Sequence, residues 1–323
     1  EQDGIQAETS VLISAGEVNV TAGGGSANGE QKTGNAMFGG AQSTTTDETL
    51  STKGIKAEAA LDITGGTVTV DSADDSLHSN DSMTVSGGGI TVKSGDDGLH
   101  ADNTLTIEDG TIVVEESCEG LEAFDLTING GTIDVTASDD GLNAAGSSVD
   151  GGFGTAGADT LTVNGGTLTV NASGDGLDSN GALTINGGTV YVSGPTGDGN
   201  GTFDCDGVFT INGGVVLGTG SSGMLKTPTA DSKQNTISVS CTGNVGDTVE
   251  VKGADGNTLV SAVAPKSFTN VMFSTPDITE GETYTVYING TEAASETCSG
   301  VVSGATGMGS FGGGPGNMGG QAP

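Results

Sequence analysis

The stretch that decides the fold is SGDDGLHADNTLTIEDGTIVV, residues 94–114. Corners that contain glycine, such as Asp109-Gly110, separate segments in which apolar and polar side chains alternate, a pattern typical of short strands joined by tight turns. The side chains predicted to face inward are Leu99, Leu105, Ile107, Ile112 and Val114. Threonines between them, such as Thr104 and Thr111, are predicted to face water.

The same pattern recurs along the chain. Its apolar anchors, one per repeat, are Ile55, Leu77, Leu99, Leu121, Leu142, Leu177 and Phe203. The steps between them are 22, 22, 22, 21, 35 and 26 residues, and a period of this size is typical of a solenoid. The spaced leucines and the Asn or Cys of a leucine-rich repeat are missing. Three short strands per repeat therefore predict an all-β parallel β-helix with about 22 residues per coil.

Changes in the repeat divide the chain into predicted domains. The parallel β-helix is predicted over residues 1–218, with loop insertions at 22–52 and 146–158 that are rich in Gly, Ser and Thr. Residues 219–298 lose the repeat but keep strand-like segments, which predicts a C-terminal β cap over the last coil. The Gly-rich residues 299–323 are predicted to form a disordered tail.

Composition restricts the partners and the environment. The net charge is −34, from 42 acidic residues against eight lysines, so nucleic acids and anionic membranes are disfavoured as partners. The sequence contains no run of 18 apolar residues, so no membrane-spanning segment is predicted. The first residues already follow the repeat, so we expect that a signal peptide and earlier coils have been removed. An acidic repeat rich in Thr, Asn and Gly predicts a secreted protein, extracellular or at the cell surface.

The four cysteines allow three pairings. Cys241 and Cys298 both lie in the predicted cap, and a disulfide between them is the preferred pairing. Cys118 and Cys205 are three coils apart, which places them about 14 Å from each other along the stack. This exceeds the reach of a disulfide, so both are predicted to be buried in place of other small residues.

Acidic residues recur at one corner of each coil, and the stacked coils should align them in a column. The predicted members are Asp74, Asp75, Asp96, Asp97, Glu119, Asp139, Asp140 and Asp175. Two unit charges one coil apart repel by roughly 1 kcal/mol in water and by roughly 3.5 kcal/mol at an effective dielectric constant of 20. Calcium, which takes six to eight oxygen ligands, would relieve this repulsion. The alternative is that these aspartates are ordinary, solvated turn residues.

A second polar column directly follows the apolar anchors. Its members are Lys56, His78, His100, Glu122, Asn143, Asp178 and Asp204. We expect them to form a flat, outward-facing stripe that binds sugar hydroxyls. If the two histidines bind zinc as a pair, the ion needs further ligands. The alternative is that both histidines are solvated and bind no metal. The chain has no Trp and only three Tyr, so stacking on neutral sugars is disfavoured.

Several of these motifs resemble those of a known family. TKGIKAEAALDITGG, SGDDGLHADNTLTI, ASDDGLNAAG and GDGLDSNGALTINGG are similar to repeats of secreted carbohydrate-binding domain proteins, found mainly in clostridia and their relatives. The resemblance covers residues 50–225 closely. It implies a right-handed parallel β-helix that binds calcium, cellulose and acidic sugars such as polygalacturonate, without established catalysis. Cys118 departs from the Asp or Gly that begins the other corner motifs, which puts a metal at that level in doubt.

Three functions remain open at this point. The first is a non-enzymatic protein that binds acidic polysaccharide, with cellulose as a further ligand. A structural rod or fibre subunit, a homo-oligomer built by end-to-end stacking of open coils, is the second. A pectate-type lyase is the third, because calcium and a base are what β-elimination of a uronate requires. Lys56 and Lys93 are the candidate bases, and neither has an arginine partner.

Overall fold

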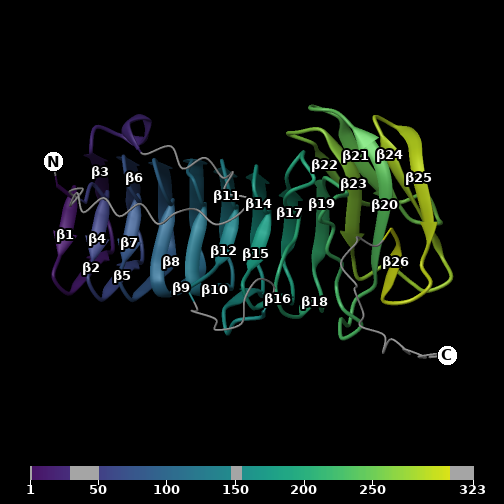
Figure 1. Ribbon diagram of the computed structural model, residues 1–323, viewed down its shortest axis with the longest axis horizontal. Helices are drawn as coiled ribbons and strands as arrows, with labels where there is room; N and C mark the ends of the chain where they lie inside the picture. Colours follow the sequence, from purple (N-terminus) through teal and green to yellow (C-terminus); the bar gives the residue numbers. More distant parts are fainter. Residues whose placement is uncertain (1, 30–50, 147–154, 306–323) are drawn as a thin grey trace, which may run out of the picture.

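The computed structural model describes residues 2–29, 51–146 and 155–305. These residues form an all-β structure in which a 3₁₀ turn at Ser26–Asn28 is the one helical element described, so the predicted all-β class is confirmed. Figure 1 shows the strands following one another along the longest axis, with β1 (Ile5–Ala7) and β25 (Thr291–Thr297) at opposite ends. One sheet of 22 strands and one of four account for the strands that the structure describes.

Parallel pairing between successive repeats builds the large sheet as three ladders. The first ladder contains β1 (Ile5–Ala7), β4 (Ile55–Ala57), β7 (Leu77–Ser79), β9 (Leu99–Glu116), β10 (Leu121–Ile128), β12 (Leu142–Ala144) and β15 (Leu177–Ser179). The second contains β2 (Ser10–Ile13), β5 (Ala60–Ile63), β8 (Ser82–Ser94), β9, β10, β13 (Thr160–Val163), β16 (Ala182–Ile185) and β18 (Phe209–Ile211). The third contains β3 (Glu17–Ala22), β6 (Thr67–Ser72), β8, β9, β11 (Thr132–Ala137), β14 (Thr167–Ala172), β17 (Thr189–Ser193) and β19 (Val215–Gly220). β8 and β10 continue through a corner and so belong to two ladders each, and β9 continues through two corners and belongs to all three.

The apolar anchors stack as the sequence predicts. Leu77 pairs with Leu99, Leu99 with Leu121 and Leu121 with Leu142, and each is fully buried. An isolated bridge adds Phe203 beyond Leu177, so the register survives the longer steps between the last repeats. Inward side chains of all three ladders join one continuous apolar core.

The glycine pairs at one corner are needed for the stacking. Gly88 has a φ of 92°, and a Cβ atom built there would lie 2.9 Å from the carbonyl oxygen of Gly66 in the neighbouring repeat. Any other residue would therefore meet both a strained backbone and a steric clash. Next to this corner, asparagine side chains bond to one another from repeat to repeat, with Asn164 Nδ2 donating to Asn129 Oδ1 at 2.8 Å and Asn186 Nδ2 to Asn164 Oδ1 at 2.8 Å.

The C-terminal part continues the large sheet and adds a second one. β23 (Phe268–Ser274) pairs antiparallel with β19 and with β20 (Thr236–Gly243). The four-stranded sheet has the order β22 (Thr258–Val263), β21 (Thr248–Lys252), β24 (Thr283–Ile288) and β25 (Thr291–Thr297). A second apolar core lies here, and Figure 1 places this part at the C-terminal end of the ladders.

Two expectations for the C-terminal part need correction. Cys241 and Cys298 are buried free thiols, so the preferred disulfide is wrong. β26 (Val302–Gly304) pairs in parallel with β20, so the segment predicted as a disordered tail over 299–323 begins with a strand. Most of the predicted insertions, at 30–50 and 147–154, and the rest of the tail, at 306–323, lie outside the described residues. None of the helical structure described is long and apolar enough to span a bilayer.

Candidate metal and ligand site

The predicted column of corner carboxylates is present. Backbone hydrogen bonds connect successive corners, from Ser76 N to Asp97 O, from Gly98 N to Glu119 O and from Gly120 N to Asp140 O. Side chains add to these contacts, because Asp75 Oδ1 accepts a hydrogen bond from the Asp97 backbone N–H at 3.2 Å. The corners therefore stack as closely as the strands beside them.

The second polar column faces outward from the anchors, as expected, but two of its side chains are covered by their neighbours. His78 and Asn143 are only 7% and 8% exposed. The carboxylates of the first column fold against the second, with His78 Nδ1 2.8 Å from Asp75 Oδ2 and His100 Nδ1 3.0 Å from Asp97 Oδ2. Of the two histidines, His78 is buried, whereas the side chain of His100 is 23% exposed to solvent.

The two columns converge because of their spacing in the chain. In each case the carboxylate and the histidine lie three residues apart and flank the inward-facing anchor, Leu77 or Leu99. The anchor occupies the core side, so its two polar neighbours meet on the outside of the corner. At these two levels the predicted metal ligand and the predicted sugar-binding residue thus belong to one site.

Lys53 is a member of this site that the sequence reasoning missed. Its Nζ lies 2.9 Å from Asp74 Oδ1 and 2.6 Å from Asp75 Oδ2. Burial alone would raise the pKa of Asp75, but the hydrogen bond from His78 and the charges of Lys53 and His100 hold that pKa well below its usual range. The signal was available, because Ile55 pairs with Leu77 and so Lys53 stands one repeat before Asp75 in the same column.

Four groups of side chains bring potential ligand atoms within 4.8 Å of one another in the described part of the chain. They are Asp75 with His78 and His100; Asp97 with His100 and Glu122; Asp74 with Asp75 and Asp96; and Asp140 with Asp175 and Asp178. Of the predicted calcium ligands, Glu119 and Asp139 fall in none of these groups. Lys56 also stays apart, with its Nζ 3.3 Å from Glu58 Oε1. The roles predicted for all these residues stay predictions.

Asp140, Asp175 and Asp178, here called the aspartate cluster, lack a positive neighbour. No ion pair to any of the three is present among the described residues. Burial, reinforced by the neighbouring carboxylates Asp175 and Asp139, raises the pKa of Asp140 to about 9. Burial and nearby carboxylates likewise raise the pKa values of Asp175 and Asp178 to about 7. The cluster therefore resists full ionisation unless a cation joins it.

Asn143 supplies an independent indication at the neighbouring level. It pairs with Asp178 in the first ladder, and its Nδ2 donates to Glu119 Oε2 at 2.9 Å. Its Oδ1 is buried without a hydrogen-bond partner in the described structure. A buried amide oxygen left in this state costs free energy, and a hard cation is one group that accepts such an oxygen as a ligand.

The level of Cys118 differs from its neighbours. Burial raises the pKa of the Cys118 thiol to about 12, and the carboxylates Asp139 and Asp97 add to the effect, so the sulfur stays protonated. A protonated thiol is a poor metal ligand. Burial, followed by the charges of Glu119 and Asp97, raises the pKa of Glu122 to about 10, so full ionisation of the acidic side chains is unfavourable here as well.

A separate crevice of about 470 Å³ lies between the third ladder and the four-stranded sheet. Its lining includes Tyr191, Leu217, Val249 and Asn171, and Asp134 is the one charged residue among the described lining. Its largely apolar walls contrast with the polar columns. A charged polymer therefore finds more suitable groups along the columns than in the crevice.

Comparison with known proteins gives one positive result. The family model described as carbohydrate-binding domain-containing protein matches residues 1–98 and 98–294. No curated protein and no solved structure gave a match.

Proposed function

The chain belongs to the carbohydrate-binding domain-containing protein family, and from this premise we propose that it is a secreted, non-catalytic protein that binds acidic polysaccharide. Membership supports a carbohydrate ligand and a polysaccharide partner. Polygalacturonate serves as the model ligand, because regularly spaced carboxylates on the polymer match regularly spaced carboxylates on the protein. Cellulose, which carries no charge, is a further proposed ligand.

We also propose that the three ladders form a right-handed parallel β-helix. Parallel pairing from repeat to repeat, with the anchors stacked from Ile55 to Phe203, supports this architecture. Such a scaffold repeats its surface groups at intervals of about 4.8 Å. Because the core fixes each coil, the polar columns form a long and rigid surface suited to an extended polymer.

The observation that carries the proposal is the aspartate cluster. A protein of charge −34 repels a polyanion, and this cluster is the part of the site without a lysine or histidine partner in the described structure. Three carboxylates with oxygens within 4.8 Å of one another, and the orphaned Oδ1 of Asn143 nearby, fit a hard divalent cation. We propose calcium there, held by Asp140, Asp175 and Asp178.

Bound calcium would neutralise the cluster and offer open coordination positions to uronate carboxylates. The protein's own contribution is to keep the three carboxylates converged, because Asp175 N–H donates to Asp140 Oδ1 at 2.6 Å and the Asp175 carboxylate accepts from the backbone of Gly201. At the other end of the column, Lys53 already compensates Asp74 and Asp75. Calcium is therefore proposed at the aspartate cluster rather than at every acidic corner.

Binding without catalysis is the favoured form of the activity. Lys56 is ion-paired with Glu58, and Lys93 Nζ lies 3.2 Å from Glu115 Oε2, so both candidate bases are engaged. A lyase would release unsaturated product from polygalacturonate, which ultraviolet absorbance detects. We expect no such product from the wild-type protein with calcium, while affinity electrophoresis in polygalacturonate shows retardation. Product formation would overturn the non-catalytic assignment.

The stabilisation by calcium is expected to increase with pH. The pKa values of Asp140, Asp175 and Asp178 lie above the ordinary value of 3.8, so between these values the folded chain binds more protons than the unfolded chain. The stability of the metal-free protein is thus fully present below about pH 4 and falls as the pH rises through about 7 and then about 9. Calcium should therefore raise Tm little near pH 4 and most near pH 8.

Thermal melts of metal-depleted protein, with and without added calcium, check this at each pH. Magnesium at the same ionic strength is the control, because it prefers a smaller octahedral set of ligands. An increase in Tm that is the same at both pH values would contradict the assignment of calcium to these carboxylates.

A further inference from the structure

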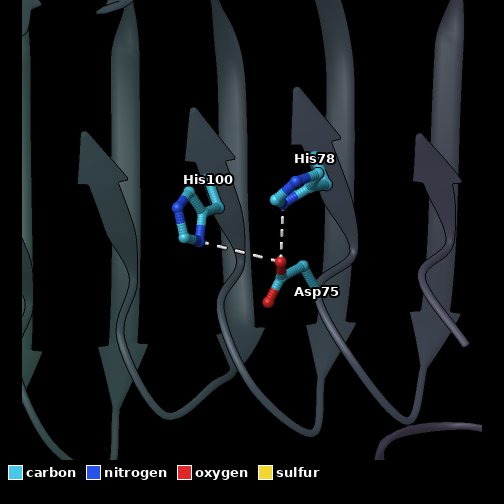
Figure 2. Close-up of side chains that lie close together, drawn as sticks. All are labelled: Asp75, His78 and His100. Carbon is cyan, nitrogen blue, oxygen red and sulfur yellow. Dashed lines mark hydrogen bonds and ion pairs between the residues drawn. The ribbon is translucent and has the colours of Figure 1, made fainter. Parts of the chain in front are cut away.

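His78 and His100 stand next to each other in the first ladder, on β7 and β9. Their ring centroids are 4.9 Å apart in an edge-to-face arrangement. Figure 2 shows the carboxylate of Asp75 directed between the two rings, with one oxygen facing the Nδ1 atom of each. The distances from Asp75 Oδ2 are 2.8 Å to His78 Nδ1 and 3.7 Å to His100 Nδ1. The two rings therefore face one shared carboxylate.

The outer nitrogen of each ring has an acceptor of its own. His78 Nε2 lies 2.8 Å from Asn80 Oδ1. The orientation of this amide is fixed, because Asn80 Nδ2 donates to Glu58 Oε2 at 2.6 Å, which leaves Oδ1 to accept from Nε2–H. His100 Nε2 lies 3.5 Å from Asp102 Oδ1. In a neutral His78 the proton is thus on Nε2, and the Nδ1 lone pair points at a carboxylate oxygen of Asp75.

This arrangement requires a positive species on the Nδ1 side. A nitrogen lone pair and a carboxylate oxygen at 2.8 Å repel unless a proton or a metal ion lies between them. Metal-binding histidines characteristically give their second N–H to a carboxylate or a carbonyl oxygen, as His78 does here to Asn80 Oδ1. The outer contact of His78 is therefore that of a metal ligand.

Further oxygens complete a ligand set around His100. Its Nδ1 lies 3.0 Å from Asp97 Oδ2, 3.7 Å from Glu122 Oε2 and 3.7 Å from Asp75 Oδ2. Ligand atoms at 2.0–2.2 Å from a tetrahedral zinc ion are separated from one another by about 3.4 Å. The observed separations fall on both sides of this value, so small side-chain movements suffice to close the shell.

We propose that Asp75, His78, Asp97, His100 and Glu122, here called the histidine cluster, bind a divalent transition metal of the zinc class. Two imidazole nitrogens distinguish this cluster from the aspartate cluster, which offers oxygen alone. Nitrogen donors favour zinc and its neighbours, whereas calcium favours oxygen. One continuous polar column thus carries two cation sites of different chemistry, and the second does not depend on the proposed carbohydrate function.

Two groups compete with the metal at this site. Lys53 Nζ contacts the same Asp75 oxygen at 2.6 Å, and a proton on either histidine would satisfy the same pair of atoms. If Lys53 and such a proton neutralise the carboxylates, the histidines are only ion-pair partners of these carboxylates and bind no metal. Zinc binding measured directly distinguishes the two states.

The test uses the full chain after metal depletion, with excess calcium present to occupy sites made of oxygen alone. Isothermal titration with zinc chloride should show one tight site in the wild type. His100→Gln should weaken zinc binding at least tenfold, and Asn80→Ala, which removes the acceptor of His78 Nε2–H, should weaken it by about 10- to 100-fold. Asp178→Asn is the matched control, because it removes a carboxylate from the aspartate cluster and should leave zinc binding unchanged.

A measurement on the wild type covers the case in which a variant fails to fold. The chain has two histidines, so its imidazole NMR signals belong to His78 and His100 alone. Zinc should shift the signals of both rings, with saturation at one equivalent. Zinc that binds without moving them is held by other carboxylates, and this outcome, like the absence of tight binding, would overturn the proposal.

Discussion

Leu121→Asp is expected to abolish cooperative folding of the ladders. Leu121 is fully buried and pairs with Leu99 on one side and Leu142 on the other, so it lies in the middle of the apolar stack. Loss of the side chain alone costs about 2–5 kcal/mol, and burial of an unpaired carboxylate adds several more. The total approaches the whole stability of a typical protein, about 5–15 kcal/mol.

Leu12→Asp is the matched control, because the same chemical change is made at a leucine of β2 that is 65% exposed. Circular dichroism melts of the two variants should show a cooperative transition near that of the wild type for Leu12→Asp and none for Leu121→Asp. Cooperative melting of both variants with small shifts in Tm would show that Leu121 is not in the core, and the stacked architecture would fail with it.

The double variant Asp140→Asn with Asp175→Asn is expected to change stability in opposite directions with and without calcium. In the metal-free protein the raised pKa values show that ionisation of these buried groups is unfavourable, so neutral amides should raise Tm near pH 8. In the presence of calcium the variant should lose the stabilisation that the wild type gains. Polygalacturonate binding should weaken at least tenfold, because the charge bridge is lost.

A second double variant controls for the change in net charge. Asp62→Asn with Asp134→Asn also removes two carboxylates, but from β5 and β11, outside the four groups of potential ligands. It should leave the calcium-dependent rise in Tm and the retardation by polygalacturonate near wild-type values. Equal losses in both double variants would mean that net charge, rather than the aspartate cluster, controls binding.

The sequence was informative wherever one residue type repeats at one position. Leu77, Leu99 and Leu121 recur at a fixed step, and a core of stacked strands accepts apolar residues at that position alone, so their burial could be predicted. The same reasoning aligned the corner carboxylates, since backbone register carries the side chains with it. The strand β26 was missed because three residues in a Gly-rich context give no periodic signal.

The candidate site was harder to predict, because periodicity fixes register but does not give side-chain direction. Asp75 and His78 were assigned to different columns, although both turn outward beside Leu77 and meet at 2.8 Å. Lys53 was missed because only acidic residues were sought at this corner, from Asp74 onward, and the preceding member of the column carries the opposite charge. Neighbouring charges determine which corners need a cation. These charges come from other repeats, so the sequence of one repeat does not reveal them.

We propose that this protein holds acidic polysaccharide through calcium at a cluster of its own carboxylates. Isothermal titration of polygalacturonate into the wild-type chain, in calcium and again after metal depletion, tests it most directly. We expect measurable binding in calcium and no detectable binding without it, because like charges then face each other across the interface. Equal affinity in the two conditions would contradict it.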